Sequence, residues 1–327
     1  MSNSEAVLLA RLGAMGDIIH TLPAAASLKQ SFPDKRLIWI VKPKWMPLLS
    51  GNPFIDELVP FGWHNAQEVF ASWRRIRRIK PVLAFDFQGL VQSAVLARAS
   101  RPAELWGFDR SVARERASSV FYSKAIRVAG PHRVQRNLQL AHAAGARRLT
   151  DEAWLPAGRE EGNLPTSPFV LTAPFAGWAG KQWPLERYEE LATLLANEGI
   201  TLVANVSEEQ AEELSRFRNL CVHTSSIAGL IAAIRRATAV VGVDSGPLHI
   251  AAALKKPGVA IFGPTDPAAT GPYGGSITVI RTPGTATTYN RHSTIHKSMM
   301  DISATEVFKL LMGSLEKKQN FVATRNV

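Results

Sequence analysis

Short apolar runs alternate along this chain with longer stretches in which apolar residues recur at helical spacing. Short runs rich in β-branched and aromatic side chains are typical of strands buried in a parallel sheet, and the stretches between them are typical of crossover helices. This alternation predicts an α/β fold built from βαβ units. We predict strands at residues 6–12, 37–41, 82–87, 169–173, 200–205, 239–243 and 259–262. We predict helices at residues 18–30, 70–79, 89–99, 134–144, 185–197, from 208 onward, 227–236, 247–254 and 303–316.

The alternation is interrupted between residues 149 and 167, where prolines and glycines replace the periodic pattern. Such a stretch is typical of a linker, and a chain of 327 residues is long enough for two domains. We therefore predict two Rossmann-like domains, residues 1–160 and 161–302, facing a central cleft.

A last helix and tail, residues 303–327, follow the second domain. Ser303 and Glu306 have the spacing of a capping box, which marks the start of a helix. We expect this segment to pack back on the first domain.

The turn after the first predicted strand contains Gly13, Gly16 and Asp17. Ligands bind beyond the carboxyl ends of strands in such sheets, so this turn is a candidate site. The macrodipole of the following helix would stabilise the Asp17 carboxylate. A third glycine, needed for a dinucleotide fingerprint, is missing, and an acid at the tip would repel a pyrophosphate. Asp17 is therefore either a helix cap or a catalytic carboxylate, and the turn argues against a nucleotide site in the first half.

A second candidate follows the strand at residues 239–243, where Asp244, Ser245 and Gly246 lead into a helix. Free backbone N–H groups and the dipole at such a helix start bind anions, and a diphosphate fits this chemistry. His249 lies in the first turn and would reach the same ligand. A lone histidine here could equally be a core residue, but its place beside the Asp-Ser-Gly turn favours function.

Lys181 lies between a glycine-containing loop and the helix predicted from residue 185. A lysine there can neutralise phosphate, although a single lysine is more often only a surface residue. The run Phe262-Gly263-Pro264-Thr265-Asp266-Pro267 follows another strand. Its prolines suit a rigid loop at the rim of a site, and ordinary turn chemistry explains it almost as well.

The positive charge is concentrated in one part of the chain. The net charge is +11, and residues 73–148 alone hold 16 Lys and Arg against 4 Asp and Glu. A basic first half implies an anionic partner: an acidic glycolipid, an anionic membrane surface or a nucleic acid. The alternative is a basic surface that only maintains solubility. No interleaved aromatics or DNA-reading motif accompany the charge, so we do not expect nucleic acid.

The remaining composition describes an ordinary globular chain. The single cysteine, Cys221, excludes an intrachain disulfide and favours a reducing compartment. We expect no signal peptide and no membrane span, because the longest apolar stretch is cut by Arg235 and Arg236. The sequence contains no Asp-x-Asp pair and no His/Cys cluster at ligand spacing, so we expect no bound metal.

Taken together, these motifs resemble those of the bacterial ADP-heptose:lipopolysaccharide heptosyltransferases, most of all the enzymes that add the first heptose. The resemblance covers nearly the whole chain. It rests on the runs that begin at Gly16-Asp17, Asp86-Phe87 and Gly107-Phe108, on Ala113-Arg114-Glu115, and on the Asp244–His249 and Phe262–Pro267 signatures.

The resemblance implies a GT-B fold and an inverting, metal-independent transfer of heptose from ADP-heptose to a Kdo-bearing lipid A. Asp17 would be the general base, and Arg114 and Arg136 would hold the acidic acceptor through guanidinium–carboxylate contacts. The implied donor-binding residues are Lys181, Glu208, Ser225, Asp244, Ser245, Gly246 and His249. No cofactor is implied. The enzyme would work in the cytoplasm, bound peripherally to the anionic cytoplasmic face of the inner membrane.

Several alternatives stay open at this point. Ala176, Gly177 and Trp178, just before the lysine, are closer to the pattern of the second-heptose enzymes. Another sugar or acceptor is therefore an alternative. A non-catalytic binder of nucleotide sugars or glycolipids would have no use for Asp17. A sugar-nucleotide 2-epimerase of the same fold would leave the basic first half unexplained.

Overall fold

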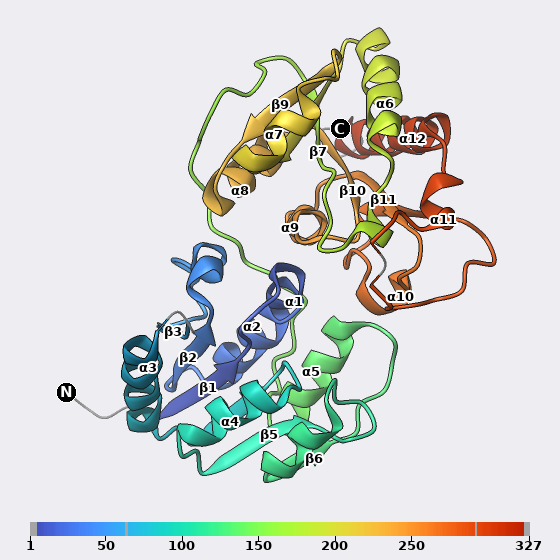
Figure 1. The fold of residues 1–327 in the computed structure, drawn as a ribbon. Coiled ribbons are helices and arrows are strands. Elements are labelled where there is room, and N and C mark those ends of the chain that lie inside the picture. The colour runs from blue at the N-terminus through green and yellow to red at the C-terminus, as the bar shows by residue number, and fades with distance from the viewer. Residues whose placement is uncertain (1–4, 63–64, 292, 324–327) are drawn as a thin grey trace. The chain divides into compact units, whose positions relative to one another are not determined.

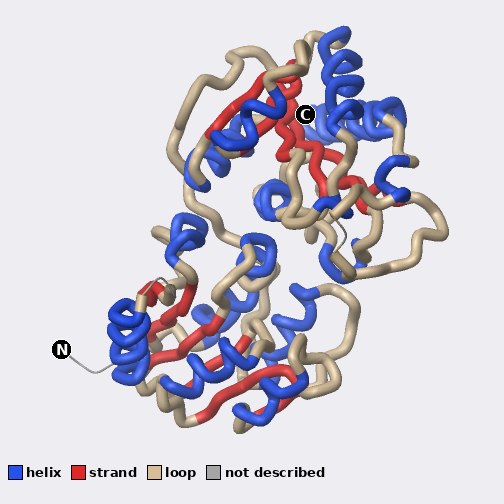
Figure 2. Tube along the Cα trace, viewed as in Figure 1, coloured by secondary structure: helices blue, strands red, loops and turns tan. Residues whose placement is uncertain are grey.

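The computed structural model of the protein describes residues 5–62, 65–291 and 293–323. The chain divides into two compact units, residues 1–156 and 157–327, and each is a parallel sheet covered by helices (Figure 1). The division falls slightly before the boundary that we expected after residue 160. Residues 149–167 contain neither helix nor strand, as the sequence predicted (Figure 2).

The first unit contains a six-stranded parallel sheet in the order β3-β2-β1-β4-β5-β6. Helix α2 packs against α5, and α3 packs against α4. The strands are β1 (Ala6–Ala10), β2 (Arg36–Val41), β3 (Glu57–Pro60), β4 (Leu83–Asp86), β5 (Glu104–Phe108) and β6 (Lys124–Ile126). The helices are α1 (Met15–Ile19), α2 (Leu22–Ser31), α3 (Ala66–Ile79), α4 (Val91–Ala99) and α5 (Arg133–Ala143), with the 3-10 turns η1 (Pro43–Leu48) and η2 (Arg116–Phe121).

The second unit repeats this topology, with a six-stranded parallel sheet in the order β12-β11-β10-β7-β8-β9. In both units the first and fourth strands along the chain are neighbours, which is the strand order of the Rossmann fold. The strands are β7 (Phe169–Ala173), β8 (Thr201–Val206), β9 (Leu220–Thr224), β10 (Ala239–Val243), β11 (Gly258–Phe262) and β12 (Ile277–Arg281). The helices are η3 (Ala179–Lys181), α6 (Leu185–Asn197), α7 (Glu208–Leu214), α8 (Ile227–Arg236), α9 (Gly246–Ala253), α10 (Pro267–Thr270), α11 (Lys297–Met300) and α12 (Ala304–Ala323).

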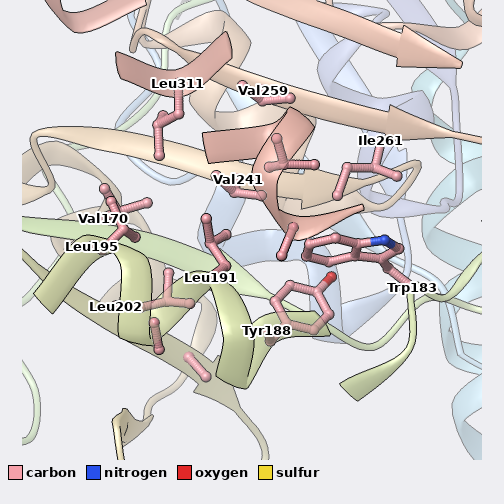
Figure 3. Packing of buried hydrophobic residues seen from close by; sticks show 14 of the residues in the cluster. Val170, Trp183, Tyr188, Leu191, Leu195, Leu202, Val241, Val259, Ile261 and Leu311 are labelled. Carbon is pink, nitrogen blue, oxygen red and sulfur yellow. The ribbon is translucent and has the colours of Figure 1, made fainter. Parts of the chain in front are cut away.

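The core of the second unit lies between its sheet and the helices α6 and α12 (Figure 3). The Trp183 and Tyr188 rings meet edge to face, with centroids 4.9 Å apart, and the Trp183 indole donates to the Ile302 carbonyl at 3.0 Å. Val307 and Leu311 of α12 are fully buried in the same cluster. Our expectation that the C-terminal helix packs back on the first domain was therefore wrong. Its apolar face is needed to cover the β10–β11 side of the second sheet.

The helix predicted at residues 18–30 is two helices, α1 and α2. The chain breaks at His20 and Thr21, and Pro23 lies in the first turn of α2, where a missing N–H costs least. The break leaves α1 as a single turn at the end of β1. Asp17 lies in this turn, at the carboxyl edge of the sheet.

Candidate active site

The charged residues singled out by the sequence lie at the carboxyl edges of the two sheets. In the first unit Asp17 follows β1, and in the second unit Lys181 follows β7 while Asp244 follows β10. These strands border the point where the strand order reverses, which is where open α/β sheets bind ligands.

Three arginines surround the Asp17 carboxylate. Arg11 reaches the Oδ2 atom at 2.7 Å, Arg133 forms an ion pair with Oδ1, and the Arg114 guanidinium lies 4.0 Å from Oδ2. The Asp17 side chain is 14% exposed. Both carboxylate oxygens are thus already paired with cations, and the cluster has a surplus of positive charge. Asp17 is more than the helix cap that remained an alternative, because its ion pairs come from three other segments.

Arg11 is the buried member of the cluster. Its side chain is 5% exposed, and it donates to the Phe87 carbonyl at 2.5 Å. Burial lowers the pKa of the Arg11 guanidinium, and the charge of Asp17 opposes that shift. The next residue, Leu12, donates its N–H to Gln88 Oε1 at 2.8 Å. These hydrogen bonds connect the end of β1 to the end of β4 and hold the backbone of the site in place.

Asp86, the last residue of β4, organises the turn that follows this strand. Its carboxylate accepts hydrogen bonds from the Gly89 N–H at 3.1 Å, from Ser93 Oγ at 3.0 Å and from Tyr122 Oη at 2.7 Å. Burial raises the pKa of Asp86, and these donors oppose the rise. The Asp86 bonds are structural, because they fix the Gln88–Gly89 turn and tie it to Ser93 of α4 and to Tyr122.

Gly89 is the point of closest approach in that turn. Its φ is +67°, and a Cβ atom there would lie 3.2 Å from the Arg114 backbone nitrogen. The Gly89 carbonyl accepts the Glu115 N–H at 2.9 Å, and Glu115 Oε2 accepts the Val91 N–H at 2.7 Å. The structure therefore packs together two of the segments that carry the family resemblance.

The two arginines expected at the acceptor site have different partners in the structure. Arg114 belongs to the Asp17 cluster, whereas Arg136 donates to the Gly130 carbonyl at 2.9 Å. Arg133 and Arg11 were not among the residues predicted from the sequence. Arg133 is the first residue of α5, and this helix starts at the carboxyl edge of the sheet. A cation there is opposed by the helix dipole and is compensated by Asp17.

In the second unit the Asp244 carboxylate links two of the expected donor-site residues. Lys181 Nζ lies 3.1 Å from Oδ2, and His249 Nε2 lies 3.7 Å from Oδ1. All three side chains are largely buried. Burial raises the pKa of Asp244, but the interactions with His249 and Lys181 outweigh it and hold that pKa well below its usual range. The site therefore contains an ionised carboxylate that fixes the lysine.

Ser245 and Gly246 lie next to this ion pair, at the start of α9. Ser245 precedes the helix with extended backbone, and Pro247 occupies its first turn. Within the described ranges the Ser245 hydroxyl oxygen is buried and has no hydrogen-bond partner. The backbone N–H groups at the start of a helix have no partner within the helix, so they are the groups here that can bind an anionic ligand.

Glu208 and Ser225 lie farther along the same edge, after β8 and β9. Glu208 is exposed in the first turn of α7, and Ser225 Oγ accepts from Asn205 Nδ2 at 2.7 Å. No contact recorded for the described residues joins either one to Asp244. In the 262–267 loop, Asp266 caps α10 by accepting from the Ala268 N–H at 2.9 Å, which is the turn chemistry considered above.

The comparisons with known proteins place the chain in a family. Residues 69–299 match the model of glycosyltransferase family 9 (heptosyltransferase). The lipopolysaccharide heptosyltransferase 1 of Pseudomonas aeruginosa is 32% identical over 293 residues, which are 83% of this chain and 82% of that protein. The chain belongs to glycosyltransferase family 9. The lipopolysaccharide heptosyltransferase 1 of Escherichia coli K12 is 30% identical, over 85% of this chain and 93% of that protein.

Solved structures show the same family resemblance. The Escherichia coli heptosyltransferase WaaC with ADP superposes with a TM-score of 0.77 at 27% identity, covering 94% of this chain and 99% of that chain. Its structure with ADP-2-deoxy-2-fluoro heptose gives a TM-score of 0.74 at 26% identity, with the same coverage. This family 9 glycosyltransferase therefore has the GT-B fold expected from its sequence. The membership sets aside the epimerase and the non-catalytic binder.

Two further observations concern this glycosyltransferase. Within the described ranges no three His, Cys, Asp or Glu side chains lie close enough together to hold a metal ion. In the same ranges no helix is both long and apolar enough to cross a membrane.

Proposed function

We propose that this family 9 glycosyltransferase transfers heptose from ADP-heptose to a Kdo-bearing lipid A acceptor, with inversion and without a metal ion. The observation that carries the proposal is the Asp17 carboxylate held among Arg11, Arg114 and Arg133. A base surrounded by surplus cations fits an acceptor that carries its own carboxylate next to the hydroxyl that reacts. The identity to heptosyltransferase 1 enzymes supports the same assignment.

The acceptor side works by an exchange of ionic partners. Arg133 and Arg114 are partly exposed, at 34% and 53%, whereas Arg11 is buried. An incoming carboxylate can take over the two exposed guanidiniums, because Arg–carboxylate pairs form readily in bidentate geometry. This exchange frees Asp17 Oδ1 to accept the acceptor hydroxyl proton, while Arg11 keeps the carboxylate in position.

The donor side supplies charge for the leaving group. We assign the diphosphate to Lys181 and to the backbone N–H groups of Ser245 and Gly246 at the start of α9. Asp244 and His249 would contact the sugar or its phosphate, and Glu208 and Ser225 would contact the nucleoside. Preorganised cations and dipoles of this kind stabilise developing negative charge without a metal.

The proposed reaction is a single displacement. Asp17 takes the proton from the acceptor hydroxyl, whose oxygen attacks the anomeric carbon of heptose as the bond from that carbon to the diphosphate oxygen breaks. The bonding electrons leave with ADP, whose new charge Lys181 neutralises. Attack opposite the leaving group inverts the anomeric configuration. The reaction would take place at the cytoplasmic face of the inner membrane, where both substrates meet.

Ala176, Gly177 and Trp178 support a second candidate, transfer to a heptose-bearing acceptor. They occupy the loop before Lys181, and Lys181 Nζ lies 5.8 Å from the centre of the Trp178 ring. The composition of this loop is closer to the pattern of second-heptose enzymes than to that of first-heptose enzymes. The choice between the two acceptors is therefore made by experiment.

The test is transfer by the purified protein from ADP-heptose to Kdo-lipid A in EDTA, read by mass spectrometry, with heptosyl-Kdo-lipid A in parallel. We expect a gain of one heptose on the first acceptor only. Asp17→Asn should lower kcat by about 10²- to 10⁴-fold while ADP affinity is retained. Transfer to the second acceptor alone would establish the alternative, and full activity of Asp17→Asn would remove Asp17 as the base.

A further inference from the structure

Helix α3 has one face that packs on the core of the first unit and one that does not. Trp73, Ile76 and Ile79 point toward that core. On the outer face Phe70 is 62% exposed, and it is the one exposed aromatic side chain among the described residues of the first unit. The next turns carry arginines at positions 74, 77 and 78, all exposed.

The outer face is strongly basic. Helix α3 contains four arginines and one glutamate. A hollow of about 510 Å³ lies beside its last turns and is lined by Arg36, Arg74, Arg75 and Arg78 together with Glu57. Glu57 pairs with Arg75 at 2.9 Å and with Arg36 at 3.7 Å, which leaves Arg74 and Arg78 without a carboxylate among these lining residues.

The order of charge and apolar surface along the helix points to one kind of partner. The Arg74 guanidinium lies 5.7 Å from the Phe70 ring centre, so an aromatic ring and a cation share one patch. A folded acidic protein would complement the arginines but would leave Phe70 in water. A helix that presents arginines around an exposed aromatic side chain fits the boundary between lipid headgroups and acyl chains.

We propose that the outer face of α3 docks this protein on anionic phospholipid bilayers, with the Phe70 ring in the interface and Arg74, Arg77 and Arg78 on lipid phosphates. The inference rests on the proposed function only in that a lipid acceptor gives the enzyme a reason to be at the bilayer. The docking residues are separate from the Asp17 cluster. Arg78 and Ile79 lie near the first residues of β2 and β3, at the sheet edge opposite Asp17.

Docking through α3 also leaves the sheet edge that carries Asp17 accessible to a lipid acceptor. The helix begins on the carboxyl side of the sheet and ends on the amino side. If α3 lies flat on the bilayer, the strands of the first unit lie roughly along the surface. The Asp17 edge then stays open to an acceptor whose lipid chains remain in the membrane.

The experiment is binding of the full-length protein to vesicles of phosphatidylethanolamine and phosphatidylglycerol, with pure phosphatidylcholine vesicles as the uncharged reference. Each basic residue near an anionic surface contributes about fivefold to binding. The triple variant Arg74→Gln, Arg77→Gln, Arg78→Gln should therefore bind about 100-fold more weakly. The matched control removes three exposed arginines elsewhere, at positions 147, 148 and 218. The control variant should lose much less vesicle binding than the α3 variant.

Phe70→Ser should weaken binding at low and high salt alike, whereas the arginine variants should lose only the salt-sensitive part. Arg75 is left in place because it pairs with Glu57. Equal loss in the control triple, or equal binding of wild type to phosphatidylcholine, would overturn the inference. So would a change of oligomeric state in the α3 variants with unchanged vesicle binding, which would make the face a protein interface. None of these measurements needs transfer activity, so a failed heptose assay leaves the test intact.

Discussion

Arg133 forms an ion pair with Asp17 across 116 residues of sequence. Arg133 opens α5, and Asp17 lies in α1 directly after β1. The pair occupies the Oδ1 atom, while the buried Arg11 occupies Oδ2. In the proposed mechanism the Asp17 base therefore starts from a paired state, and the acceptor would have to replace one of its partners.

The first prediction follows from this exchange. Arg133→Ala should lower kcat/KM for a carboxylate-bearing acceptor by about 10- to 100-fold, the value of a charge-assisted hydrogen bond. Most of the loss should appear in KM for the acceptor, because the base itself remains held by Arg11. Steady-state kinetics with an acceptor whose carboxyl group has been reduced to an alcohol is the control. On that acceptor wild type and variant should differ little.

Arg136 provides the comparison. It lies on the same helix as Arg133 but donates to the Gly130 carbonyl. We expect Arg136→Ala to have a smaller effect on acceptor KM than Arg133→Ala. A larger effect of Arg136→Ala would assign the acceptor carboxylate to Arg136 and leave Arg133 as a structural partner of Asp17.

A second prediction concerns Lys181. Its ammonium group is held 3.1 Å from Asp244 and would be shared with the diphosphate. Lys181→Ala should weaken ADP binding by about 10- to 100-fold and adenosine binding very little, because adenosine has no phosphate to neutralise. Calorimetric titration of both ligands separates the two. An equal loss of adenosine affinity would mean that the substitution has disturbed the fold at the carboxyl edge of the second sheet.

Glu161 gives a third prediction, on stability. Its carboxylate accepts from the Ser226 N–H at 2.7 Å and from Ser226 Oγ at 2.8 Å, at the start of α8. The Ser226 N–H, Arg159 and the Ser226 hydroxyl lower the pKa of Glu161 to about 2 from an ordinary value of 4.5. A carboxyl pKa that is lowered in the folded state stabilises the protein above the unfolded-state pKa. This contribution is lost as the pH falls toward the folded-state pKa.

Glu161→Gln should therefore be less stable than wild type above about pH 4.5, and the difference should shrink as the pH falls toward 2. Urea unfolding at several pH values measures it. If the difference in unfolding free energy does not depend on pH, Glu161 stabilises the protein through its packing and not through its charge.

A fourth prediction concerns Gly89. An alanine there would adopt φ near +67° and crowd the Arg114 backbone nitrogen at 3.2 Å. Gly89→Ala should cost about 1–2 kcal/mol of unfolding free energy from backbone strain alone. It should also weaken acceptor binding through Arg114 while ADP affinity stays unchanged. Normal acceptor KM in a destabilised variant would mean that the turn does not position Arg114.

The central strands of both sheets were predictable from sequence, and the edge strands were not. The four strands missed at the edges are β3, β6, β9 and β12. A central strand is buried on both faces and therefore reads as a continuous apolar run, as in β10. β12 has exposed residues in its middle, and β6 is mostly exposed. The inner strand β5 was missed because Glu104 and Gly107 interrupt its apolar pattern.

The same limit applies to the site. Asp17, Lys181 and Asp244 could be singled out from the sequence because each lies in the segment that links a predicted strand to the next helix. Arg133 and Arg11 were not singled out, since their role depends on contacts between segments far apart in sequence. One signal was present. The first residue of a crossover helix lies nearest the carboxyl edge, so Arg133 was better placed than Arg136 to reach Asp17.

Each unit contains the counter-ions of its own site. The cations around Asp17 come from the end of β1, the loop after β5 and the start of α5, and Lys181, Asp244 and His249 all come from the second unit. A chimera that took one unit from a relative would therefore keep the ion pairs described here in the other unit. Evolution, or a designer of chimeras, can alter what one half recognises while these pairs are inherited with the other half.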